Sequence, residues 1–295
     1  MQQRILLADI DNTLYDWPSF FAPSLRAMVH VLSRELRVKE DQLYEELKAV
    51  FRRHGSLEYA FVVQELDSVR SLELERVRQL VGLARGAFNS VRRKHLAPYP
   101  GVRETLEWLH RQDVVVIGVT NSPVYRAQHR LFDLRLDSLL SGLIAWEGFE
   151  VSDDDSANKG FVPTGHTRVR TRLLSQRVWG VAQGECKPNP QHYKRALEFL
   201  GMKSADVWAI GDSKAKDLEP AAKLGIRTIW ARYGAKDDPD NPNLDMATLL
   251  RITHWSSSRI QETYKKDDFV PDEIVDSFAD IRKKGIIREK YPMLF

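Results

Sequence analysis

Three short segments of the chain are apolar at every position, without the alternation of apolar and polar residues that marks a half-exposed strand. They cover residues 5–8, 114–119 and 207–210. Runs of this kind are typical of parallel strands in a sheet that helices cover on both faces. Between them, apolar residues recur three and four positions apart, for example over residues 102–109, which indicates amphipathic helices. The alternation predicts an α/β fold with a Rossmann-like, doubly wound parallel sheet.

A long helical block interrupts this alternation immediately after the first strand. From residue 16 to residue 97 no segment has the pattern of a strand, and the apolar spacing is helical, beginning with a helix over 23–36 that has Pro23 in its first turn. The cluster Pro98-Tyr99-Pro100-Gly101 then breaks the helical pattern. We therefore expect two units: a sheet core made of residues 1–15 and 98–295, and an inserted helical unit made of residues 16–97.

Two stretches of the expected core do not fit the simple alternation. Residues 149–184 carry the acidic run Asp153-Asp154-Asp155 followed by a basic alternating run, and residues 235–272 are polar and rich in turn-forming residues. Both are expected to be insertions whose charges face water. Either insertion could reshape the mouth of a site or mediate self-association, so the sequence leaves a homo-oligomer open.

The composition excludes several classes of protein. Among 295 residues, 44 Lys and Arg against 41 Asp and Glu leave a net charge of +3, which gives no basis for a nucleic acid polymer or an anionic membrane as the main partner. The single cysteine, Cys186, excludes an internal disulfide and a cysteine-built zinc site, and we interpret it as a small buried residue. The apolar runs are too short for a signal peptide or a membrane span, so a cytoplasmic protein is expected.

Polar residues gather at the ends of all three apolar segments. Asp9 and Asp11 follow the first, Thr120 and Asn121 the second, and Asp212 the third. Ligands of open α/β sheets bind outside the carboxyl ends of the strands, so these residues are expected to form one site. Carboxylates held close together need a cation or a shared proton, and three of them without histidine or cysteine favour Mg²⁺. A threonine hydroxyl beside backbone N–H groups suits a phosphoryl group.

Four segments of the chain resemble, in order, the four motifs of the haloacid dehalogenase-like (HAD) hydrolase superfamily. They are Asp9-Ile10-Asp11-Asn12-Thr13-Leu14, Val119-Thr120-Asn121-Ser122, Lys187-Pro188-Asn189-Pro190, and Ile210-Gly211-Asp212-Ser213 with Asp217. Lys159 is an alternative lysine for the third motif, but no proline follows it. The resemblance covers about residues 1–15 and 98–234, and the helical block 16–97 stands where phosphatases of this superfamily insert their first type of cap.

The resemblance implies a role for each motif residue. Asp9 would be the nucleophile that forms an aspartyl-phosphate, and Asp11 would be the general acid and then the general base. Thr120 and the N–H of Asn121 would hold the phosphoryl group, and Lys187 would neutralise charge between that group and Asp9. Mg²⁺ would be held by Asp9, the backbone carbonyl of Asp11 and Asp212, with Asp217 beside them. The candidates for cap residues that select the substrate are Trp17, Arg52, Arg53 and His54.

The motif set predicts a Mg²⁺-dependent phosphatase that acts on a small phosphorylated metabolite. The segment Asp11-Asn12-Thr13-Leu14-Tyr15 resembles the opening of superfamily members that act on pyrimidine nucleotides, which makes a nucleotide monophosphate one candidate. Asp11 argues against the dehalogenase branch, which lacks this second aspartate. A phosphomutase with the same motifs and a catalytically silent binding protein remain alternatives. A two-component-type receiver domain shares the doubly wound sheet but has no helical insertion after its first strand.

Overall fold

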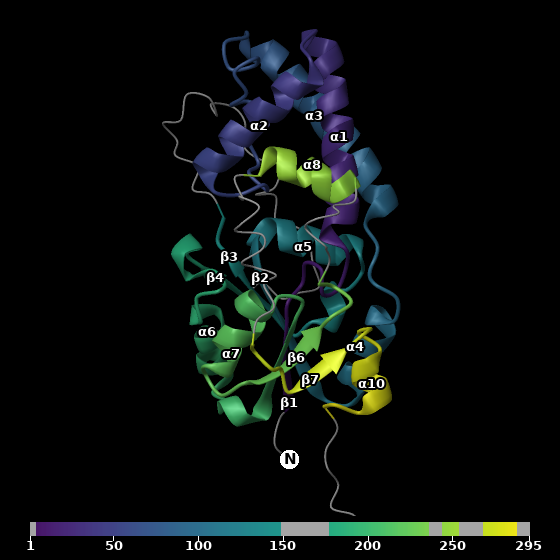
Figure 1. The fold of residues 1–295 in the computed structure, drawn as a ribbon, viewed down its shortest axis with the longest axis vertical. Coiled ribbons are helices and arrows are strands. Elements are labelled where there is room, and N and C mark those ends of the chain that lie inside the picture. The colour runs from purple at the N-terminus through teal and green to yellow at the C-terminus, as the bar shows by residue number, and fades with distance from the viewer. Residues whose placement is uncertain (1–3, 149–176, 236–243, 254–267, 288–295) are drawn as a thin grey trace, which may run out of the picture.

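A seven-stranded parallel sheet forms the core of the protein (Figure 1). The computed structural model describes residues 4–148, 177–235, 244–253 and 268–287, and the strand pairs within these ranges are parallel. The strand order is β4-β3-β2-β1-β5-β6-β7, so the first strand of the chain lies at the centre of the sheet. The predicted α/β class with a doubly wound parallel sheet is confirmed. The strands are β1 (Arg4–Ala8), β2 (Val114–Pro123), β3 (Gly142–Trp146), β4 (Val178–Val181), β5 (Val207–Gly211), β6 (Arg227–Ala231) and β7 (Glu273–Val275).

Helices cover both faces of this sheet. Alternate side chains of β1 point to opposite faces and pack against the helices on each side. Leu6 and Ala8 belong to the apolar cluster of α4, α5 and α10, whereas Ile5 and Leu7 belong to the cluster of α6 and α7. All four side chains are at most 1% exposed, which is why β1 is apolar at consecutive positions. The helices are α4 (Val102–Arg111), α5 (Val124–Asp133), α6 (Gln191–Leu200), α7 (Glu219–Ala222) and α10 (Asp280–Lys284), with short helical turns η1 (Asp137–Leu139), η3 (Gln183–Glu185), η4 (Ser204–Asp206) and η5 (Lys214–Leu218).

Three helices form a separate layer above the carboxyl ends of the strands (Figure 1). They are α1 (Trp17–Leu36), α2 (Glu40–His54) and α3 (Leu74–His95), and α1 packs along α3. Residues 55–73 between α2 and α3 form turns, so the helical spacing over residues 59–66 does not correspond to a regular helix. The apolar residues of that segment are nevertheless buried, among them Phe61 and Leu66. A buried irregular segment can therefore imitate helical periodicity.

The first of these helices begins earlier than its sequence pattern predicts. Asp16 caps the N-terminus of α1 by accepting a hydrogen bond from the backbone N–H of Ser19 (3.2 Å), and Pro18 occupies the first turn. Pro23 therefore lies inside the helix and not in its first turn. The cap and Pro18 together satisfy the usual requirements of a helix start, which is why the helix can begin at Trp17.

The two stretches expected as insertions each contribute an element to the fold. Within 149–184, the described residues include β4, which extends the sheet beyond β3, and residues 149–176 lie outside the described ranges. Within 235–272, helix α8 (Leu244–Ile252) packs against α1 and α2 and not on the sheet, as Figure 1 also shows. Arg26 on α1 holds it through hydrogen bonds to Asp245 (2.9 Å) and Thr248 (3.0 Å). Residues 236–243 and 254–267 lie outside the described ranges.

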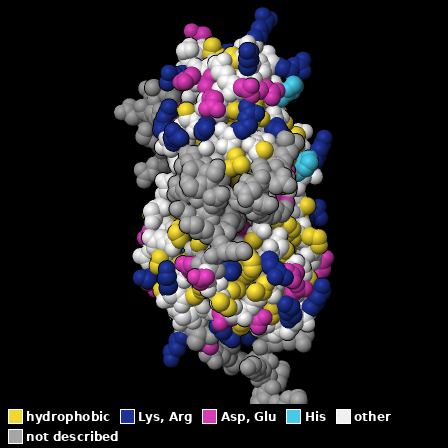
Figure 2. All heavy atoms as spheres, viewed as in Figure 1, with side chains coloured by type: hydrophobic (Ala, Val, Ile, Leu, Met, Phe, Trp, Pro, Cys, Tyr) yellow, Lys and Arg dark blue, Asp and Glu magenta, His cyan; other side chains and the backbone are white. Residues whose placement is uncertain are grey.

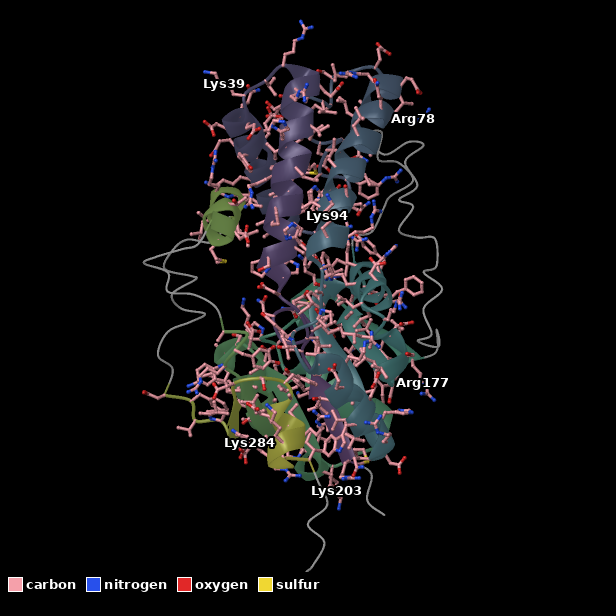
Figure 3. All side chains as sticks on the ribbon, turned by 90° about the vertical axis from the view of Figure 1, so that its right-hand side faces the viewer. Lys39, Arg78, Lys94, Arg177, Lys203 and Lys284 are labelled. Carbon is pink, nitrogen blue, oxygen red and sulfur yellow. The ribbon has the colours of Figure 1, made fainter. Side chains whose placement is uncertain are left out.

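The surface carries charges of both signs along the whole molecule. On the face shown in Figure 2, basic and acidic side chains are interspersed over the helical layer and over the sheet layer. Figure 3 marks the two ends of the molecule, with Lys39 and Arg78 at the outer end of the helical layer and Lys203 and Lys284 at the opposite end of the core. None of the described helices combines the length and the apolar character that crossing a bilayer requires.

The capping of α1 can be tested directly. We expect Asp16→Ala to lower the free energy of unfolding by about 1 kcal/mol, because the N–H and hydroxyl groups of Ser19 lose their acceptor. Asp16→Asn keeps an acceptor oxygen and should lose less. Urea denaturation of the three proteins measures both differences. An alanine variant as stable as the wild type would contradict this account of the helix start.

Candidate active site

The sequence-predicted polar residues meet at the carboxyl edge of the central strands. Asp9 directly follows β1, Thr120 lies near the end of β2, and Asp212 directly follows β5. Asp217 reaches the same place from η5, because β5 ends in a glycine: a Cβ at Gly211 would lie 2.4 Å from the Cβ of Asp217. Only a residue without a side chain lets that carboxylate come so close to the strand.

The ammonium group of Lys187 lies inside this group of acids. Its Nζ donates hydrogen bonds to Asp9 Oδ1 (2.5 Å), Asp217 Oδ1 (2.6 Å) and the backbone carbonyl of Val119 (3.0 Å). These three bonds use all the donors of the ammonium. Burial alone would lower the pKa of Lys187, but Asp217 and Asp9 outweigh it and hold this pKa well above its usual range. The lysine is therefore a permanent positive charge that is only 6% exposed.

Three buried carboxylates surround a common point beside this lysine. Ligand oxygens of Asp9, Asp212 and Asp217 all lie within 4.8 Å of one another. Burial raises the pKa of Asp9 to about 7, with Asp217 adding to the rise and Lys187 opposing it. Burial, then Asp217 and Asp9, also raise the pKa of Asp212 well above its ordinary value. One ammonium cannot balance three carboxylates, so the cluster suits an added divalent cation that prefers oxygen ligands.

The side chain of Asp11 lies outside this cluster of carboxylates. The metal set expected from the sequence was Asp9, Asp11 and Asp212, whereas the third carboxylate of the cluster is that of Asp217. Asp11 had been expected to contribute its backbone carbonyl, and its side chain is engaged elsewhere. It accepts hydrogen bonds from the hydroxyls of Tyr15 (2.5 Å), Thr120 (3.0 Å) and Ser122 (2.7 Å). These three donors fix the direction in which the carboxylate of Asp11 points.

Asn121 connects the second motif to the third. Its side chain donates to the backbone carbonyl of Lys187 (2.8 Å) and accepts from the backbone N–H of the same residue (2.8 Å). This two-point contact resembles a pair of strand hydrogen bonds and holds the backbone of Lys187 against the end of β2. The sequence resemblance assigned a role only to the N–H of Asn121, so this contact is an addition to the expected site.

Sequence reasoning missed a buried ion pair next to Asp11. Arg130 on α5 pairs with Glu58, and the two residues are 4% and 8% exposed. The Nη2 of Arg130 also donates to Ser122 Oγ (2.6 Å) and lies 3.5 Å from Asp11 Oδ1. An arginine on the apolar side of α5, between the buried Ala127 and Leu131, was the available signal. Its partner Glu58 lies in the irregular segment between α2 and α3, where no pattern in the sequence indicated a buried charge.

The four candidate residues of the helical unit do not gather at one place. Trp17 donates from its Nε1 to Glu58 Oε1 (3.2 Å) and stacks on Phe21 with ring centroids 4.3 Å apart. Arg53 and His54 both pair with Glu65, at 2.9 and 2.8 Å. Arg52 is exposed. Among these residues, the described contacts connect only Trp17 to the pair next to Asp11.

A family model for haloacid dehalogenase-like hydrolases matches residues 4–225. Glyceraldehyde 3-phosphate phosphatase of Pyrococcus furiosus is 22% identical over 232 residues, which cover 78% of this chain and 81% of that protein. The enzyme of the same name from Methanopyrus kandleri is 24% identical over 247 residues, which cover 82% and 89%.

Solved structures show the same fold. The 2-haloacid dehalogenase of Pseudomonas syringae superposes with a TM-score of 0.55 at 16% identity, over 96% of this chain and 97% of that chain. A putative β-phosphoglucomutase from Thermotoga maritima gives a TM-score of 0.52 at 18% identity, over 96% of this chain and 99% of that chain. At such identities the likeness concerns the arrangement of the chain and not the reaction.

When EDTA keeps the protein free of metal, the raised pKa of Asp9 should make the free energy of unfolding depend on pH. Burial raises the pKa of Asp9 from its ordinary value of 3.8 to about 7 in the folded protein, so the folded protein binds more protons than the unfolded chain between these two pH values. Its contribution to the free energy of unfolding should therefore fall as the pH rises from 5 to 7, by on the order of a few kcal/mol. Urea denaturation at several pH values measures the slope.

Asp9→Asn is the control for this measurement, because it removes the titrating group. The variant should have a flatter profile between pH 5 and pH 7 than the wild type. Parallel profiles for the two proteins would show that the buried carboxyl does not titrate in this range.

Proposed function

The chain belongs to the haloacid dehalogenase-like hydrolase family, and we propose that it is a Mg²⁺-dependent phosphatase of small phosphate monoesters. The membership confirms the resemblance inferred from the four motifs and the expectation of a hydrolase. The names of the two glyceraldehyde 3-phosphate phosphatases support a phosphate ester as substrate. The observation that carries the proposal is the buried ammonium of Lys187 between Asp9 and Asp217. This arrangement lets a carboxylate approach a negatively charged phosphoryl group.

Asp9 is the nucleophile in this proposal. A carboxylate and a phosphate dianion repel each other, and Lys187, 2.5 Å from Asp9 Oδ1, reduces that repulsion. Thr13 donates from its hydroxyl to Asp9 Oδ2 (2.7 Å), which fixes the plane of the carboxylate. Attack on phosphorus forms an aspartyl-phosphate, which is an acyl phosphate, and breaks the bond to the leaving oxygen. Water then attacks phosphorus, breaks the bond to Asp9, and releases inorganic phosphate with the carboxylate restored. Two successive displacements divide one difficult hydrolysis into easier steps.

The carboxylate cluster fits Mg²⁺ by the chemistry of its donors. Asp9, Asp212 and the backbone carbonyl of Asp11 would hold the ion, with Asp217 beside them, and every donor is an oxygen. The bound ion supplies positive charge that offsets the charge of the phosphoryl group.

Asp11 serves as the proton donor and then as the base. Its carboxylate is 22% exposed against 7% for Asp9, so it faces the accessible side of the site. It protonates the leaving oxygen in the first displacement and accepts a proton from water in the second. Thr120 and the N–H of Asn121 hold the phosphoryl group during both steps.

The helical unit 16–97 acts as the cap over a core made of residues 1–15 and 98–295. Its irregular segment brings Glu58 to Arg130, directly beside the residues that position Asp11. A cap in this place excludes water and restricts the substrate to small molecules. Helix α8, which packs on α1 and α2, adds a segment from the second half of the chain to this cap.

Phosphate release from 4-nitrophenyl phosphate tests the proposed reaction. We expect turnover with Mg²⁺ and its loss with EDTA, because the acidic cluster would lack its counter-ion. Asp9→Asn should reduce kcat by at least about 10³-fold, since the nucleophile is removed. Asp67→Asn is the control, because it makes the same change at an aspartate whose side chain is 63% exposed and pairs with Arg70 in the segment between α2 and α3.

The outcome separates the alternatives. Full activity in Asp9→Asn or in EDTA would defeat the mechanism. Conversion of a sugar phosphate to its isomer without phosphate release would indicate a phosphomutase. Lack of Mg²⁺ binding and of turnover would indicate a silent binding protein.

The Arg130–Glu58 pair yields a separate prediction. Arg130→Gln removes the donor to Ser122 and the charge beside Asp11, so proton donation to the leaving oxygen should suffer. The loss of kcat/KM should be larger, by roughly tenfold, for an alkyl phosphate than for 4-nitrophenyl phosphate, which needs no proton on its leaving oxygen. The ratio of the two rates does not depend on how much of the variant is folded. Equal losses on both substrates would assign Arg130 a purely structural role.

A further inference from the structure

A cavity of about 290 Å³ lies between the helical layer and α5. Its walls come from α1, α2, α3, α5 and the irregular segment after α2, and its lining contains neither Asp9 nor Lys187. A cavity of this size has room for a small organic group. The catalytic cluster therefore has a separate chamber next to it.

The lining of the cavity combines two kinds of side chain. Apolar and aromatic residues include Phe20, Phe21, Met28 and Phe88. Four residues are arginines: Arg85 and Arg92 come from α3, and Arg126 and Arg130 from α5. The lining includes four arginines but a single carboxylate, that of Glu58, which Arg130 already neutralises.

The arginines of the lining keep donors beyond those used in their ion pairs. Arg130 pairs with Glu58, and Arg92 uses Nη1 to bind Asp133 (2.6 Å). A guanidinium has five N–H donors and no acceptor, so a single carboxylate does not use all of them. Four such groups in the lining favour a ligand group that accepts hydrogen bonds and carries negative charge.

The cavity is one side chain away from the proposed general acid. Arg130 lines the cavity, and its Nη2 is 2.6 Å from Ser122 Oγ and 3.5 Å from Asp11 Oδ1. Glu58 also lines the cavity and is held by Arg130 and by Trp17. The Arg130–Glu58 pair thus forms the wall that the cavity shares with the surroundings of Asp11.

We propose that the cavity binds the leaving group of the substrate, and that this group combines an apolar or aromatic body with an acidic group. The inference rests on the proposed phosphatase function and adds a substrate class to it. The aromatic wall contacts the body of the leaving group, and Arg92 and Arg126 bind its carboxylate or a comparable anion. The substrate is thus a monoester with a second negative charge far from the phosphoryl group.

Two matched substrates test the proposal: 4-carboxyphenyl phosphate and 4-carbamoylphenyl phosphate. They have nearly the same shape, but only the first carries a second negative charge. The carbamoyl group withdraws electrons at least as strongly, so leaving-group chemistry alone does not favour the carboxylate. We expect kcat/KM of the wild type to be at least about tenfold higher for the carboxylate, as a charged hydrogen bond would give.

Substitutions in the cavity should remove this preference. Arg126→Gln and Arg92→Gln should each lower the ratio of the two kcat/KM values several-fold. Arg78→Gln is the matched control, because Arg78 lies on α3 near the outer end of the helical layer and does not line the cavity (Figure 3). The ratio is measured on one enzyme preparation, so incomplete folding of a variant does not change it.

A ratio near one in the wild type would overturn the proposal, and so would a ratio unaffected by both cavity substitutions. Failure of the phosphatase function gives a different result, namely no turnover of either ester with Mg²⁺. In that case the affinities of the Asp9→Asn variant for the two esters, measured by calorimetry, test the cavity assignment without any turnover. Tighter binding of the carboxylate that Arg126→Gln abolishes supports the cavity assignment, and equal binding overturns it.

Discussion

A buried ammonium among carboxylates is the interaction on which the candidate site depends. Lys187 makes three hydrogen bonds, and two of its acceptors are Asp9 and Asp217. Buried carboxylates at this distance repel one another, and the ammonium of Lys187 offsets part of that repulsion. The ends of β1, β2 and β5 position Asp9, Thr120 and Asp212. Gly211 leaves space for the side chain of Asp217, and Asn121 holds the backbone of Lys187. Together these features bring the ammonium and the carboxylates to one place at this edge of the sheet.

The second organising feature is the chain of contacts from Asp11 to the helical unit. Ser122 bonds to Asp11, Arg130 bonds to Ser122, and Glu58 pairs with Arg130. The carboxylate of Glu58 has a pKa below its usual value, because Arg130 and other donors outweigh the effect of burial. It is thus a fixed negative charge. Arg130 consequently lies beside the proposed proton donor Asp11, pairs with Glu58 of the helical unit, and lines the cavity.

The sequence predicted those parts of the molecule that have a strong local pattern. The central strands are apolar on both faces, and the motif residues follow them directly, so both could be located. The edge strand β7 is only three residues long and begins with Glu273, and β4 follows a charged stretch, so neither has a clear signal. Glu58 and Arg130 are 72 residues apart, and their pairing depends on how the helical unit lies on α5. For the same reason the pairing of Arg53 and His54 with Glu65 had no signal in the sequence.

Helix α8 changes how the helical unit is tethered. A unit inserted into a loop is connected to the rest of the protein at two points, and two such connections can act together as a hinge. In this chain they are the segments before α1 and after α3. Here the chain leaves the sheet again after β6, contributes α8 to the helical layer, and returns for β7. The unit is thus connected at four points. Any movement of α1 and α2 away from the sheet must therefore either carry α8 with it or break the packing of α8 on these two helices.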